Sequence, residues 1–259
     1  MFLIKSRNIL ANDATHRRSC INVIKTKIGS IMPRPAEGFT LAEVLITLGI
    51  IGIVAAMTIP TLMSKIQWLV LKQQFKESYS TMNQALKLVY EKNDTIYNCY
   101  YIENGKSHIQ GPQTSSECIA LYEELKQVLK ISHVCQNNAY KNGCIPKYKG
   151  INDVYTELDP DSEYTSTGCD GFKTNSILNT NPAWVLGDGT IIGFYQPESD
   201  PFTKIFFMDI NGNKKPNKWG YDIFAFMVMS DKQGAKLYIK PRGCSYIQKG
   251  GKSGKEMLE

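Results

Sequence analysis

The sequence predicts an α+β fold, in which a long N-terminal helix packs against a C-terminal antiparallel sheet. An apolar run over 44–59 continues into apolar residues spaced three, four and seven apart as far as residue 89, which is a helical pattern. From residue 183 the pattern changes to short apolar segments separated by turn residues, which indicates strands. Six cysteines follow the apolar run: Cys99, Cys118, Cys135, Cys144, Cys169 and Cys244.

Charge is unevenly distributed along the chain. The 259 residues carry a formal net charge of +6. Residues 1–38 hold seven basic and two acidic residues, a net +5, which leaves 23 basic and 22 acidic residues in 39–259. The larger part is therefore near neutral, and no nucleic-acid partner is indicated. Basic residues before an apolar run predict a cytoplasmic N-terminus and a C-terminal domain outside the membrane.

The first element is a helix over about 39–94. Residues of about 41–63 are apolar all round and long enough to span a bilayer, and Pro60 can kink a membrane helix without ending it. Beyond residue 64 one face is apolar and the other carries polar residues such as Lys72 and Glu77. At 1.5 Å per residue the helix is about 80 Å long, more than a membrane anchor requires. We therefore expect its second half to pack against the globular domain of 95–259.

The middle of that domain, 95–180, is predicted to be disulfide-rich. A helix is expected over 115–131, and the polar residues of 132–180 are expected to form loops. An even number of cysteines outside the cytoplasm predicts three disulfides, with fifteen possible pairings. Cys135–Cys144 is the easiest local closure and Cys99–Cys118 the next, which would leave Cys169 with Cys244.

The sheet is predicted over 183–240. Its expected strands are 183–186, 190–195, 204–210, 222–229 and 235–239, and Gly187-Asp188-Gly189 joins the first two as a short hairpin. The tail of 249–259 is polar and glycine-rich, so we expect it to be flexible.

The junction Gly38-Phe39-Thr40-Leu41-Ala42-Glu43 places one carboxylate inside the apolar stretch, where an acid is costly without a functional reason. The pattern resembles the type III signal sequence of type IV pilins and of the pseudopilins of type II secretion. The resemblance implies that a prepilin peptidase removes 1–38 as a leader, cuts after Gly38 and methylates the new N-terminus at Phe39. It also implies that Glu43 neutralises the terminal amine of a neighbouring subunit. Met32 offers a second start that would give a short leader.

The same resemblance implies a pilin-like structural subunit and not an enzyme. Such a subunit resides in the cytoplasmic membrane and then assembles with other pilin or pseudopilin subunits, through its N-terminal helix, into an extracytoplasmic pseudopilus or type IV pilus. The alternative is a filament-tip adhesin on the same anchor, with 95–180 as its binding surface. A membrane-tethered enzyme is disfavoured because the sequence has no G-x-S-x-G, phosphate-loop or H-E-x-x-H motif.

One further cluster has the residue types of a calcium loop. Asp209, Asn211, Asn213 and Asp222 could supply oxygen ligands. The match then fails, since Lys214 stands where such a loop needs glycine and Gly220 where it needs glutamate. A hairpin turn explains the same residues, so no metal and no cofactor are expected.

Overall fold

The computed structural model describes residues 38–94, 97, 102–103, 106–107, 114–165, 169–195, 205–230, 236–243 and 246–259. The chain divides into two compact units, Met1–Val54 and Ala55–Glu259, each of which we describe by itself. Residues 1–37 of the predicted leader (1–38), Cys99 and Cys244 lie outside the described residues.

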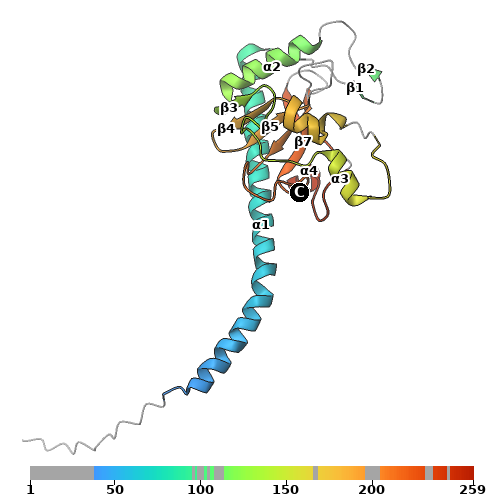
Figure 1. The fold of residues 1–259 in the computed structure, drawn as a ribbon. Coiled ribbons are helices and arrows are strands. Elements are labelled where there is room, and N and C mark those ends of the chain that lie inside the picture. Colours follow the sequence, from blue (N-terminus) through green and yellow to red (C-terminus); the bar gives the residue numbers. More distant parts are fainter. Residues whose placement is uncertain are drawn as a thin grey trace, which may run out of the picture. The chain divides into compact units, whose positions relative to one another are not determined.

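The long helix, α1, runs over Leu41–Asn93 and contains Pro60, as the sequence predicts. Its large aliphatic side chains up to Val70 are exposed, and the helix is long and apolar enough to cross a membrane. From Leu71 onward one face is buried, and these buried residues recur every three or four positions: Leu71, Phe75, Ser78, Met82, Ala85, Leu86 and Val89. This face packs on the sheet in the second unit, as the expected fold requires (Figure 1).

The sheet has six antiparallel strands in the order β3-β4-β5-β6-β7-β8. The strands are β3 (Ile131–Cys135), β4 (Ala183–Leu186), β5 (Ile191–Phe194), β6 (Ile205–Asp209), β7 (Ile223–Ser230) and β8 (Leu237–Pro241). Five of them match predicted strands, including the β4–β5 hairpin around Asp188, whereas β3 was not predicted. A separate two-stranded pair joins β1 (Ile102–Glu103) and β2 (Lys106–Ser107).

Both faces of the sheet are buried. Along β6, Phe206 and Met208 face the core formed with α1 and with α2 (Thr114–Val128), while Ile205 and Phe207 face a second core. Strand β7 alternates in the same way, so its sequence reads as a continuous apolar run. The sheet is thus the middle of three layers.

The third layer corrects the prediction that 132–180 is only loop. This segment holds most of β3, then α3 (Ile151–Leu158), η1 (Asp170–Phe172) and η2 (Ser176–Thr180). Its buried side chains cover the second face of the sheet: Cys135, Ala139, Cys144, Ile145, Tyr148, Ile151, Val154, Cys169, Phe172, Ile177 and Leu178. Because these apolar residues are scattered through a mostly polar segment, the sequence pattern did not indicate secondary structure there.

The prediction of a flexible tail over 249–259 is wrong. Residues Gly254–Leu258 form α4, and Met257 is fully buried in the core shared with α1. Ser253 and Glu256 form a reciprocal capping box, in which each side chain accepts a hydrogen bond from the backbone N–H of the other. The cap and the buried Met257 hold this segment in place, although its glycine content predicted a flexible tail.

Candidate functional site

The processing junction lies at the start of α1. Gly38, Phe39 and Thr40 precede the first helical residue, and the Phe39 side chain is 85% exposed. Thr40 and Glu43 form a capping box: the Thr40 N–H and hydroxyl donate to Glu43 Oε2 at 2.8 and 2.9 Å, and the Glu43 N–H donates to Thr40 Oγ1 at 3.2 Å. The helix therefore has a defined beginning immediately after the predicted cut.

Among the described residues of this unit, none requires glycine at position 38. A Cβ added to Gly38 would meet no atom within 4 Å, and its backbone does not adopt a left-handed conformation. Gly38 therefore lies at an exposed site in front of a capped helix. There it is accessible to another protein, such as a peptidase.

Glu43 has a second oxygen that the cap does not use. All its recorded bonds to Thr40 end on Oε2, and among the residues described around the junction none donates to Oε1. The carboxylate is exposed to its surroundings rather than enclosed by its own chain. The same side chain can thus cap its own helix and present an oxygen to another molecule.

Disulfide bonds are present among the described cysteines of the globular domain. Cys135 and Cys144 form a disulfide with a Cα–Cα distance of 6.3 Å, the local closure that the spacing favours. Cys118 is disulfide-bonded as well. Cys169 is buried, and its Sγ lies 4.0 Å from the carbonyl oxygen of Gly243, the residue before Cys244. The pairings that involve Cys99 and Cys244 lie outside the described residues and stay predictions.

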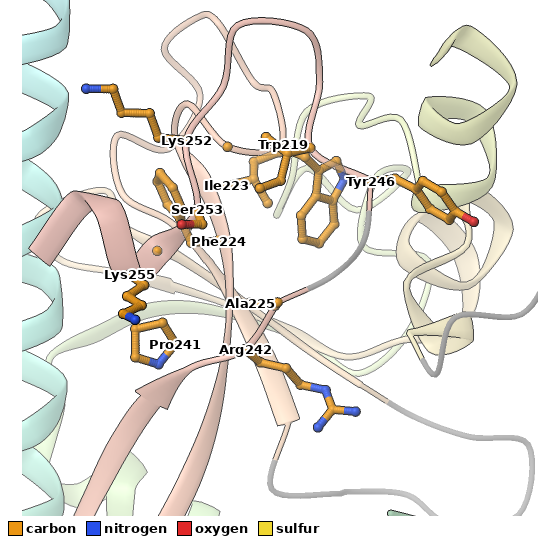
Figure 2. A pocket seen from close by; sticks show the side chains of 14 residues that line it. Trp219, Ile223, Phe224, Ala225, Pro241, Arg242, Tyr246, Lys252, Ser253 and Lys255 are labelled. Carbon is orange, nitrogen blue, oxygen red and sulfur yellow. The ribbon is translucent and has the colours of Figure 1, made fainter. Parts of the chain in front are cut away.

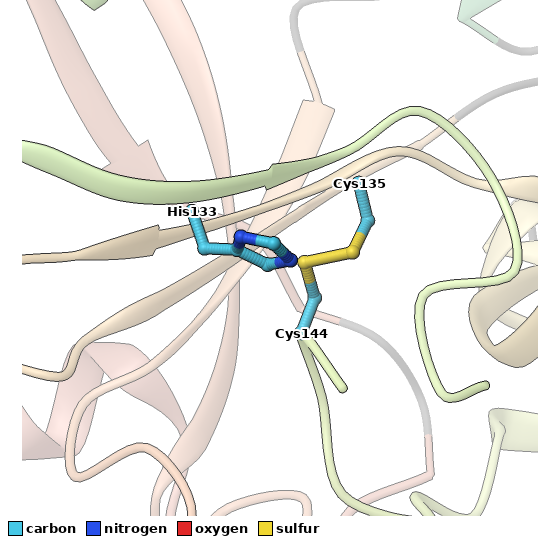
Figure 3. A group of neighbouring side chains, drawn as sticks. All are labelled: His133, Cys135 and Cys144. Carbon is cyan, nitrogen blue, oxygen red and sulfur yellow. A yellow bond between two sulfur atoms is a disulfide. The ribbon is translucent and has the colours of Figure 1, made fainter. Parts of the chain in front are cut away.

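One cluster has the residue types of a metal site. His133, Cys135 and Cys144 bring a ring nitrogen and two sulfur atoms within 4.8 Å of one another (Figure 3). The sulfurs are bonded to each other, however, and zinc takes thiolates as ligands. The cluster is therefore a disulfide with a histidine beside it, and its chemistry is structural.

The calcium candidates form a buried turn rather than an open ring of ligands. Asp209 Oδ1 accepts from the N–H groups of Asn211 and Gly212, and its Oδ2 accepts from the Tyr148 hydroxyl at 2.6 Å. The two oxygens of Asp222 accept from the N–H groups of Asn217 and Lys218. Asn211 Oδ1 is buried and accepts no hydrogen bond from a described residue.

Asn213 is exposed and takes no part in this arrangement. Burial raises the pKa of Asp209 well above its ordinary value, and the nearby charge of Asp222 raises it further. Burial also raises the pKa of Asp222, against the effect of its backbone hydrogen bonds. Two carboxyl groups in one dry region each favour the neutral form of the other.

A cavity of about 300 Å³ opens between the end of β8 and α4 (Figure 2). Trp219, Ile223 and Ala225 give it apolar walls, and Arg242 and Lys255 add positive charge at its edge. The Ser253 hydroxyl at its rim donates to Glu256 Oε2 and belongs to the α4 cap. No histidine, cysteine, aspartate or glutamate is among the described residues that line this cavity, so it offers no recognisable catalytic group.

Comparison with known proteins supports the interpretation of the junction as a processing signal. Residues 33–59 match the prokaryotic N-terminal methylation motif, which is the signal of type IV pilins and pseudopilins. No curated protein and no solved structure matches the chain. The long apolar helix followed by an antiparallel sheet is an α+β, pilin-like arrangement, and the motif belongs to a structural class of proteins. Motif and helix together indicate a membrane-anchored protein.

Two features of the site were missed in the sequence. Thr40-x-x-Glu43 is a capping-box pattern in front of an apolar run, and this signal was available from spacing alone. Tyr148, which donates to Asp209 across 61 residues of chain, had no local signal because the contact depends on the third layer.

Proposed function

We propose that this chain is a structural subunit, a pseudopilin or minor pilin, that a prepilin peptidase cleaves after Gly38 and methylates on Phe39. The cleaved subunit assembles with other pilin or pseudopilin subunits through its N-terminal helix, into a type II secretion pseudopilus or a type IV pilus. The observation that carries the proposal is the junction. An exposed glycine that the fold does not require stands directly before a capped apolar helix, within the matched motif.

Glu43 sets the register of assembly in this proposal. Each incoming subunit brings a charged amine at Phe39 into an apolar helix bundle, where an unpaired charge is strongly unfavourable. The Oε1 atom that the cap leaves unused gives that amine an acceptor. The alternative, a filament-tip binding subunit, stays a prediction, because most of 95–113 lies outside the described residues.

Processing is tested with two matched glycine variants. Gly38→Val should leave an uncut, unmethylated precursor, whereas Gly49→Val should be cut normally. The two sites are comparable, since an added Cβ has no described neighbour within 4 Å at either position. Intact mass of the membrane form should give a wild-type chain that begins at N-methyl-Phe39. A wild-type chain that begins elsewhere, or normal cleavage of Gly38→Val, would refute the proposed function.

A further inference from the structure

A groove of about 550 Å³ lies between α1 and the loop that joins β6 to β7. One wall is the face of α1 around Ile66 and Val70, whose side chains are 45% and 50% exposed. The other wall carries Lys214 and Lys215, both exposed. The groove is therefore apolar on one side and cationic on the other, and its volume is in the range of small-molecule sites.

An aromatic pair lies in the lining of the groove. The Trp68 and Tyr221 rings stack with centroids 4.9 Å apart, which fixes the helix to the start of β7. Lys252 places its ammonium 5.0 Å from the Trp68 ring, and Lys218 lies 5.8 Å from the Tyr221 ring. Figure 2 shows the Lys252 side chain extending toward α1. Lys214 and Lys215 thus line the groove, and Lys218 and Lys252 lie against the two aromatic rings in its lining, which are each partly exposed.

The acidic side chains near these lysines already accept hydrogen bonds from other groups. No acidic residue is among the described residues that line the groove. Asp222, next to Tyr221, is buried and accepts two backbone N–H groups. Glu256 bonds to Ser253 in the α4 cap. The lysines therefore form a local positive patch on a mature chain that is close to neutral.

The position of the groove along α1 places it at the level of the lipid headgroups. The apolar stretch of α1 that is predicted to span the bilayer ends at about Met63, before Ser64 and the charged Lys65, and Trp68 follows five residues after Met63. At 1.5 Å per residue that is about 7 Å, roughly the thickness of one headgroup layer. Tryptophan and tyrosine concentrate at this level of membrane proteins, and clustered lysines there attract anionic lipids.

We propose that this groove binds the headgroup of an anionic phospholipid in the outward leaflet, and so holds the globular domain at the bilayer before assembly. The inference rests on the proposed function for its membrane-inserted stage. The lysine wall meets the phosphate, and the exposed α1 face meets the upper acyl chain. A lipid monolayer matches this order of charge and apolar surface, whereas a second copy of this chain would have to bring acidic residues into the groove.

The test uses Trp68 fluorescence in the full chain, recovered from membranes and reconstituted in phosphatidylcholine vesicles. In each preparation a minor fraction of the lipid carries bromine on the acyl chain near the headgroup, where it quenches tryptophan fluorescence on contact. This brominated lipid is phosphatidylglycerol in one preparation and phosphatidylcholine in the other. Trp184 and Trp219 are buried, and a Trp68→Phe variant gives their background signal. We expect stronger quenching by the brominated phosphatidylglycerol, since each lysine near an anionic surface favours it by about fivefold before screening by salt.

The charge variant is Lys214→Gln/Lys215→Gln/Lys252→Gln, which should make the two lipids quench equally. The matched control, Lys130→Gln/Lys141→Gln/Lys147→Gln, removes the same charge from exposed lysines elsewhere and should keep the preference. Equal quenching by both lipids in the wild type would overturn the inference. So would a preference that the control loses as well, or quenching that disappears as protein density rises, which would assign the groove to a second copy. Cleavage at Gly38 is measured separately by mass, so failure of this test is distinct from failure of the proposed function.

Discussion

The two halves of α1 differ in what covers them. Side chains of the first half, such as Leu45 and Ile51, are each 62% exposed, although they are among the most apolar in the chain. In the second half Phe75 and Leu86 are completely buried against the sheet. The helical backbone is continuous, so the difference lies in the side chains and their partners. The first half needs lipid or another protein molecule to cover its apolar side chains. The second half is covered by the sheet of the same chain.

This comparison separates assembly from stability. A substitution in the first half should change membrane or subunit contacts and leave the globular unit intact. A substitution on the buried face of the second half should unfold that unit wherever the protein resides. Each variant below tests one side of this division.

The largest effect is expected at Glu43. Glu43→Gln keeps an acceptor for the helix cap but loses the charge, so the neighbour's amine would be buried without its counter-ion. Removing one partner of a buried pair costs about 3–5 kcal/mol, which is about two to three and a half orders of magnitude in an assembly constant. Thr40→Ala is the matched variant, since it weakens the cap by about 1 kcal/mol and leaves the charge. The filament fraction is measured against the membrane fraction for both, after confirming cleavage by mass. Normal filaments from Glu43→Gln, with loss from Thr40→Ala, would assign Glu43 to the cap alone.

Phe75→Ala should have the next largest effect. The Phe75 ring is fully buried and packs edge-on against Phe224 with centroids 4.7 Å apart. Truncation of a buried phenylalanine costs about 3–5 kcal/mol, which for a unit of this size lowers the melting temperature by about 10 °C. Ile51→Ala removes apolar surface from the exposed half and should leave the melting temperature unchanged. Equal shifts for the two variants in detergent would show that both halves depend on the same fold.

Most of the fold was predictable, because periodicity reports which faces are buried. The extent of α1 and five of the six strands follow from spacings of three, four and two in the sequence. The third layer did not, since its apolar residues are dispersed among polar ones and find each other only through the sheet. The signal that was available lay in the strands: β6 and β7 are apolar at nearly every position, and a sheet with one solvated face would alternate.

The candidate site was predictable to the extent that it is local. Gly38, Phe39 and Glu43 all lie within the six contiguous residues 38–43, and Thr40 of the helix cap belongs to the same stretch. The groove beside Trp68 could not be predicted in the same way. It brings together Trp68, Tyr221 and Lys252, which are separated by up to 184 positions, and only the packing of α1 on the sheet makes them neighbours.

A smaller effect is expected from pH, within the globular half. The pKa of Asp209 is raised in the folded state, so this carboxyl contributes stability below its unfolded pKa of about 3.8. That contribution is lost as the pH rises through the higher folded value. Asp209→Asn stays neutral and can still accept from the N–H groups of Asn211 and Gly212. Its melting temperature should therefore fall less than that of the wild type between mildly acidic and neutral pH. Asp161→Asn, at an exposed position, is the control and should follow the wild type. A wild-type slope retained by Asp209→Asn would place the titrating group elsewhere.

The smallest effect is expected from chelation, which tests whether the loop between β6 and β7 is a metal site or a turn. Calcium bound to the folded state alone would stabilise it by about 2.7 kcal/mol at a hundredfold excess over Kd, which is several degrees. We expect no shift on chelation, because backbone N–H groups already donate to the oxygens of Asp209 and Asp222. Gly212→Ala should instead be clearly destabilising. Its φ is +66°, and an added Cβ would lie 2.1 Å from the carbonyl oxygen of Gly189 in the β4–β5 hairpin. Melting that depends on calcium in the wild type and loses this dependence in Asp209→Ala would show that the buried Asn211 oxygen belongs to a cation site.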